Sequence, residues 1–272
     1  MGKVLECITD SEEAFIAKQK VFFVATAPLA KDHRVNVSPK ASGTSVVVID
    51  PHTVAYSDLT GSGAETAAHV MENGRMTILF CNLESGAPKI LRLYGTARFT
   101  VKEEVEPSLL RRFPTEITSS FGFRAIFILK VERISTSCGY SLPVMAFEKH
   151  RKILDEYTEK EGEDGMKDYC LKKNSFSIDG LPSLALIRNK NTAIVPKHVD
   201  GYIYGEVAGS NGASDDGLKR GMPTPTSRIR SEGKLAPLGI GAAVFVAGAI
   251  AGAMLIANYP LLYPRSEAFL EL

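Results

Sequence analysis

Residues 53–81 read TVAYSDLTGSGAETAAHVMENGRMTILFC, and their pattern points to one compact structural unit. The β-branched and aromatic residues of Thr53–Ser57 predict a strand. The glycine-rich Asp58–Gly63 predicts a turn, and Ala64–Glu72 predicts a helix that ends at Asn73-Gly74. Arg75–Asn82 is apolar enough to return as a second strand. The stretch therefore predicts a strand, a loop, a short helix and a strand in close succession.

The loop at the centre of this unit has the composition of a phosphate cradle. It offers free backbone N–H groups and hydroxyls directly before a helix N-terminus, where the helix dipole favours an anion. Asp58, Thr60, Ser62 and Thr66 supply its polar side chains. A plain loop beside a helix cap is the alternative interpretation of the same residues.

Further strands flank the unit on both sides. The first helix is expected near Asp10, and a second short one spans Pro107–Phe113. Runs rich in β-branched and aromatic residues predict the strands Val21–Ala27, Arg34–Ser38, Ser45–Ile49, Lys89–Thr100 and Phe123–Thr136. Six or seven strands at short spacing predict a mainly β fold with flanking helices, such as a small barrel.

Two strands carry polar residues that suggest a binding site. Arg34, Asn36 and Ser38 alternate, so they share one face of their strand, and Lys40 lies just past its expected end. Arg92 stands between Leu91 and Leu93, so it is a candidate to point into a site rather than into solvent.

Composition excludes several classes of function. The chain has 272 residues, 44% of them hydrophobic, and a net charge of +1, which is typical of a globular protein without a nucleic-acid partner. Its four cysteines form no C-x-x-C pair, and its five histidines share no i, i+4 spacing, so no metal site is expected.

The part after residue 140 predicts a different organisation. Residues 141–206 form a helical and hairpin extension packed on the barrel domain of residues 1–140, with an acidic interruption at Glu159–Gly165. Residues 207–234 are rich in Gly, Ser and Pro and predict a flexible linker.

An uncharged segment near the C-terminus predicts a membrane helix. Leu238–Ala257 lacks charge over twenty residues, about 30 Å of helix and so the thickness of a bilayer core. We therefore assign residues 235–258 to a transmembrane helix and 259–272 to a short tail; a buried core helix is the alternative. Basic residues before the helix favour a single-pass, tail-anchored membrane protein whose N-terminal domain faces the cytosol.

Three motifs carry a family resemblance: N-V-S-P-K at 36–40, D-L-T-G-S-G-x-E-T at 58–66 and E-N-G-R at 72–75. With the strands around them, they resemble the pyridoxamine 5'-phosphate oxidase-like family of FMN-binding split barrels over about residues 1–140. The resemblance implies a six-stranded split β-barrel, usually a homodimer, with FMN in clefts at the subunit interface.

The resemblance also implies roles for individual residues. Arg34 and Lys40 match basic residues around the flavin and its phosphate, and Thr66 stands where the oxidase has a phosphate-binding lysine. The full set of expected cofactor residues is Arg34, Asn36, Ser38, Lys40, Asp58, Thr60, Ser62, Thr66 and Arg92.

The function implied is that of a membrane-anchored, FMN-binding oxidoreductase acting on a small molecule. In such enzymes the cofactor supplies the chemistry, which fits the lack of an obvious nucleophile or base. The chain contains no tryptophan and lacks the oxidase's C-terminal substrate-binding pattern, so pyridoxamine 5'-phosphate oxidase activity itself is not expected. The alternative function is a non-catalytic flavin- or heme-binding module tethered to a membrane.

Overall fold

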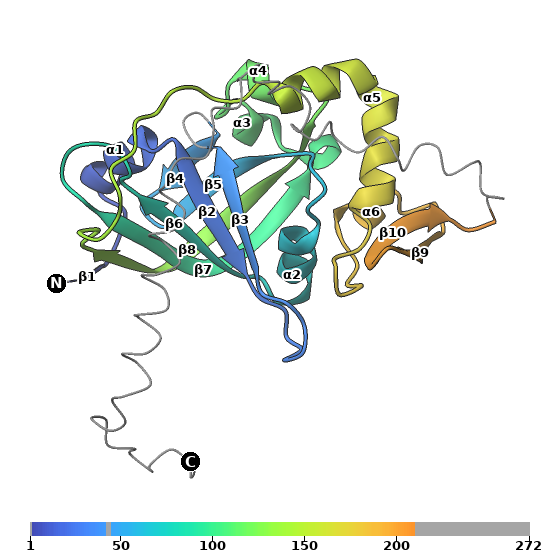
Figure 1. Ribbon diagram of the computed structural model, residues 1–272, viewed down its shortest axis with the longest axis horizontal. Coiled ribbons are helices and arrows are strands. Elements are labelled where there is room, and N and C mark those ends of the chain that lie inside the picture. Colours follow the sequence, from blue (N-terminus) through green and yellow to red (C-terminus); the bar gives the residue numbers. More distant parts are fainter. Residues whose placement is uncertain (1, 42–44, 210–272) are drawn as a thin grey trace, which may run out of the picture. The chain divides into compact units, whose positions relative to one another are not determined.

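The computed structural model describes residues 2–41 and 45–209. The chain divides into two compact units, and the described residues all belong to the first one, residues 1–219. Figure 1 shows this unit as a strongly curved β-sheet with helices at its margins.

An eight-stranded antiparallel sheet forms the body of the unit. Its order is β3-β2-β6-β7-β8-β5-β4, and β1 pairs separately with the end of β8. The strands are β1 (Lys3–Leu5), β2 (Val21–Thr26), β3 (Asn36–Ala41), β4 (Val46–Asp50), β5 (Thr53–Leu59), β6 (Arg75–Cys81), β7 (Ile90–Val101) and β8 (Phe123–Ser137).

The two longest strands are bent by a bulge. The register of β7 against β8 shifts between Tyr94 and Gly95. At Gly95 the partner strand comes so close that a Cβ atom would lie 1.9 Å from the backbone oxygen of Lys130. Glycine is therefore required there, and the bulge bends and twists the pair so that the sheet can curl.

Aromatic side chains from distant strands meet inside the curled sheet. Phe22 of β2 and Tyr56 of β5 are separated by three strands in the sheet order, yet their ring centroids lie 5.4 Å apart. Tyr56 stacks in turn on Phe127 of β8 at 5.1 Å. Contacts between strands so far apart in the order require the sheet to fold back on itself, as in a split barrel.

Helices and a small second sheet flank this barrel. Gly74 ends α2 in the left-handed conformation, at φ 72°. The helical segments are α1 (Asp10–Lys18), α2 (Glu65–Asn73), the 3-10 helix η1 (Lys102–Glu104), α3 (Pro107–Leu110), α4 (Thr115–Thr118), α5 (Ile153–Lys173) and α6 (Leu184–Arg188). β9 (Ile194–Val199) and β10 (Tyr202–Val207) form a two-stranded hairpin, and β10 packs against α5.

The predicted fold class needs two corrections. The sheet has eight strands rather than six, partly because β1 is only three residues long and too short to show a strand pattern. In addition, no helix among the described residues is long and apolar enough to cross a membrane. The 21-residue α5 has the length, but it is densely charged.

The fold class is therefore corrected to leave out the transmembrane helix that was predicted at residues 235–258. That segment, the part of the predicted linker from residue 210 onward and the tail lie outside the described residues. The corrected fold is a mainly β, split-barrel-like unit with flanking helices.

Candidate functional site

One face of β3 presents polar side chains to the barrel. Asn36, Ser38 and Lys40 are half-buried, whereas Val37 between them is 61% exposed. This is the alternation of a strand with one face turned inward. Asn36 and Ser38 therefore share a face as predicted, but Arg34, predicted to lie on the same face, precedes the strand. Lys40 lies within the strand rather than beyond its end.

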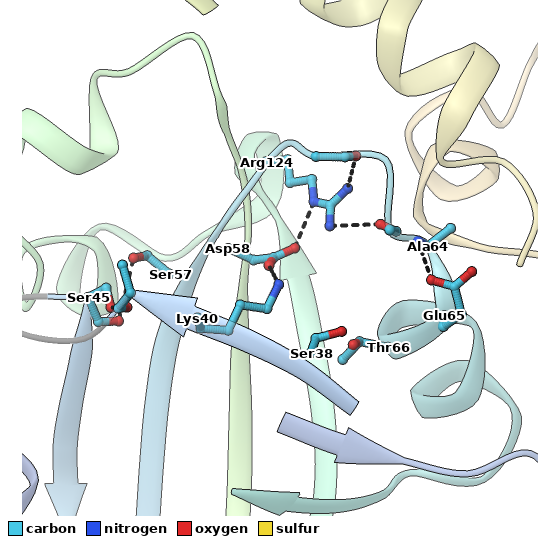
Figure 2. Close-up of polar contacts among 12 residues, drawn as sticks. Ser38, Lys40, Ser45, Ser57, Asp58, Ala64, Glu65, Thr66 and Arg124 are labelled. Atoms are coloured by element: carbon cyan, nitrogen blue, oxygen red, sulfur yellow. Dashed lines mark hydrogen bonds and ion pairs between the residues drawn. The ribbon is translucent and has the colours of Figure 1, made fainter. Parts of the chain in front are cut away.

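Asp58, near the end of β5, is the electrostatic centre of the site (Figure 2). Its carboxylate accepts hydrogen bonds from Lys40 Nζ at 2.6 Å and from Arg124 Nε at 2.7 Å. Burial alone would raise the pKa of the Asp58 carboxyl, but Arg124 and Lys40 outweigh burial and hold this pKa below its ordinary value. Asp58 is thus a buried anion shared by two cations.

Arg124 links this centre to the glycine-rich loop before α2. It is buried at the start of β8 and donates to the backbone oxygens of Gly61 at 3.4 Å and Gly63 at 3.1 Å. Asn174, after α5, donates to the oxygen of Gly61 at 2.9 Å. The loop is consequently held from two sides by buried side chains.

A second polar network joins β3 to α2. Asn36 Nδ2 donates to the hydroxyl oxygens of Thr66 at 3.0 Å and Thr26 at 3.1 Å, and Ser38 donates to Asn36 Oδ1 at 2.8 Å. His69 is fully buried, and its Nδ1 lies 3.0 Å from Thr26 Oγ1. Because Thr66 accepts in this network and donates to no side chain among the described residues, its hydroxyl hydrogen is available to a ligand. Figure 2 shows Ser38, Lys40 and Thr66 converging beside the start of α2.

Glu65 places a negative charge at the N-terminus of α2. One of its oxygens accepts from the Ala64 N–H at 3.0 Å, and the other accepts from the Ile178 N–H at 3.2 Å. Lys40 and Arg124 carry two positive charges and Asp58 carries one negative charge, so the three together have a net charge of +1. The negative charge of Glu65 offsets it. A phosphate bound there would therefore rely on hydroxyl and N–H donors as much as on net charge.

Four of the predicted site residues lie apart from this convergence. The guanidinium of Arg34 is largely exposed and paired with Asp179 instead. Arg92 donates to Ser137 on β8, at 3.1 Å. The hydroxyl of Thr60 is buried against the Cys170 sulfur at 3.7 Å, and Ser62 is exposed on the loop. The structure thus brings together Asn36, Ser38, Lys40, Asp58 and Thr66 out of the nine.

Arg124 is the principal site residue that the sequence reasoning missed. The sequence contains a pattern that could have indicated it, because Arg124 stands between Phe123 and Ala125 at the start of a long apolar strand. The same criterion that selected Arg92 selects Arg124 as well. Asn174 and Asp179, by contrast, carry no local pattern that places them near a loop more than 100 residues earlier.

The fold and the site define a class of protein: a split-barrel-like domain with a cluster of polar side chains between the inner face of a strand and a helix N-terminus. The sequence profile described as pyridoxamine 5'-phosphate oxidase matches residues 8–138. The pyridoxamine 5'-phosphate oxidase family protein ustO of Aspergillus flavus is 34% identical over 217 residues, which cover 72% of this chain and 84% of the relative. The chain therefore belongs to the pyridoxamine 5'-phosphate oxidase family.

Solved structures also resemble this chain over about half its length. Group A Streptococcus HupZ is 25% identical, with a TM-score of 0.35, and the match covers 47% of this chain and 91% of HupZ. The FAD binding protein from Mycobacterium smegmatis is 14% identical, with a TM-score of 0.33, over 49% of this chain and 93% of that protein.

Proposed function

We propose that this protein binds FMN at the polar site between β3 and the start of α2, and that it serves as a flavin-dependent oxidoreductase for a small molecule. The observation that carries the proposal is the convergence of Lys40, Ser38 and Thr66 beside a helix N-terminus, in a chain of the pyridoxamine 5'-phosphate oxidase family. A bound flavin would supply the hydride and electron transfer.

The donor set fits the phosphate and ribityl end of FMN. Lys40 keeps N–H groups beyond its bond to Asp58, and Thr66 keeps its hydroxyl hydrogen. The Asn36 side chain holds Thr66 in place, while Arg124 and Asn174 fix the loop that precedes α2. The chain's residues thus bind and orient, and Asp58 keeps both cations in position.

The carboxylate of Asp179 occupies Arg34, which was expected to contact the phosphate. Asp179 accepts from both the backbone N–H and the guanidinium of Arg34. We therefore assign the phosphate chiefly to Lys40 and the hydroxyls, and give Arg34 a minor part in binding.

A second copy of the chain is the proposed partner. Val37 of β3 and, in the connection between β2 and β3, Leu29 and Val35 are each more than 60% exposed. Exposed large apolar side chains of this kind are candidates for an interface. A homodimer formed there would place its contact on the strand whose other face carries the proposed site.

Adding FMN and then an electron donor distinguishes a flavin-dependent enzyme from a non-catalytic binding module. The full-length protein is incubated with FMN, desalted and examined for visible flavin absorbance. We expect bound flavin that loses this absorbance when NADPH or NADH is added without oxygen. A colourless protein would refute FMN binding, whereas bound flavin that neither donor reduces would favour the non-catalytic module.

A further inference from the structure

A hollow of about 300 Å³ opens at the loop that precedes Thr66 of the proposed cofactor site. Three segments line it: the loop before α2, the end of α5 with the residues that follow, and β10. The side chains that matter for its chemistry are Ser62, Glu65, Lys173, Phe176, Tyr202 and Tyr204. Ser62 and Glu65 belong to the motif that also supplies Thr66, so the hollow and the proposed cofactor site share one loop.

The walls of the hollow are held in place by close backbone packing. A Cβ atom at Gly205 would lie 2.4 Å from the backbone oxygen of Leu171, so only glycine lets β10 approach α5 this closely. Asn174 anchors the opposite wall by its hydrogen bond to Gly61. The hollow is therefore a consequence of how the C-terminal hairpin packs, not of a loose surface loop.

Its lining suits a flat ring. Phe176, Tyr202 and Tyr204 contribute aromatic surface, and the two tyrosine rings lie 6.4 Å apart with an interplanar angle of 36°. Aromatic side chains stack on planar ligands at little entropic cost. The volume lies at the small end of the range for ligand pockets, which limits the occupant to one or two rings.

The charges of the hollow favour an acidic group on that ring. Lys173 Nζ lies 4.0 Å from the centre of the Tyr204 ring, and no carboxylate among the described residues pairs with it. Both oxygens of Glu65 are already occupied by backbone N–H groups. Lys173 is thus the charge left for a ligand, whereas the charge of Glu65 is partly satisfied by the protein.

We propose that this hollow binds a small aromatic carboxylic acid, with its ring on Tyr202 and Tyr204 and its carboxylate on Lys173. If the protein is the proposed oxidoreductase, this ligand represents its class of substrate. Only that role of the ligand rests on the proposed function. Binding itself can be measured without flavin, so the two proposals fail separately.

Calorimetric titration of the full-length protein with three indoles tests the proposal. Indole-3-acetate carries the acid, indole-3-ethanol is neutral, and tryptamine is a cation of similar size. We expect the acid to bind at least about tenfold more tightly than the alcohol, as a charged hydrogen bond provides. Lys173→Gln should abolish this preference and Lys173→Arg should keep it, while Lys172→Gln, at the exposed neighbouring position, should leave it unchanged.

Further outcomes of this titration support or overturn the proposal. Tyr204→Leu should weaken both the acid and the alcohol, because it removes a stacking surface. Equal binding of acid and alcohol, or tighter binding of tryptamine, would overturn the assignment of Lys173 as the anchor. A repeat with saturating FMN should leave the acid's affinity intact; displacement of FMN by the acid would show that the hollow belongs to the cofactor's own site.

Discussion

At the scale of single residues, the site depends on one buried carboxylate serving two cations. Removing one partner of such an arrangement leaves an uncompensated charge, which costs more than the pair itself contributes. Asp58 can lose Lys40 and remain paired with Arg124, whereas loss of Asp58 would leave the buried Arg124 without a counter-ion. Lys40 is therefore the position where ligand binding can be probed with the least damage to the fold.

Lys40→Met should weaken FMN binding about tenfold, which corresponds to about 1.4 kcal/mol. The substitution removes the one net positive charge of the Lys40, Arg124 and Asp58 group. Fluorescence titration with FMN measures the effect. Lys130→Met is the matched control, because Lys130 also lies on a strand but is exposed and makes no ion pair in the described part of the chain. Equal losses in both variants would mean that the phosphate is held elsewhere.

We expect His69 to make the stability of the fold depend on pH. Burial lowers the pKa of its imidazole, against the opposing effect of Glu65 and Glu72. The unfolded chain therefore takes up a proton before the folded one does, and the free energy of unfolding falls as the pH drops below about 6.5. His69→Gln should flatten this dependence between neutral and mildly acidic pH, as measured by urea unfolding.

The exposed His198 provides the control for that experiment. His198→Gln should retain the loss of stability on acidification that the unchanged protein shows. If His69→Gln retains it too, another buried group is responsible for the pH dependence.

At the scale of elements, the sequence predicted the parts with strong local signals. Gly74 in the left-handed conformation ends α2 close to the predicted end, and the strands around it lie within a residue or two of their predicted bounds. β1 was missed because three residues cannot show alternation. The contacts of Asp179 and Asn174 were missed because they join segments more than 100 residues apart, which no local pattern encodes.

The bulge at Gly95 is the element most sensitive to substitution. Gly95→Ala should lower the free energy of unfolding by at least about 2 kcal/mol, because the new Cβ meets backbone that cannot move aside cheaply. Chemical denaturation followed by circular dichroism measures the loss. Gly61→Ala, where no atom lies within 4 Å of the added Cβ, should change stability little; similar losses at both positions would show that the bulge is not tightly packed.

At the scale of the whole molecule, the proposed dimer links the exposed strand face to the site behind it. Val37→Glu introduces a charge into the apolar group of Leu29, Val35 and Val37. We expect analytical ultracentrifugation to show a dimer for the unchanged protein and a monomer for the variant. Lys31→Glu, which changes charge nearby without touching an apolar side chain, should leave the dimer intact. A monomeric unchanged protein would remove this part of the proposal.

The central claim is that the polar site between β3 and α2 recognises the phosphate of FMN. Parallel calorimetric titrations of the full-length protein with FMN and riboflavin test it directly, because the two ligands differ only in that phosphate. We predict that FMN binds at least about tenfold more tightly, the contribution of a charged hydrogen bond. Equal affinities, or no binding of either flavin, would contradict the claim.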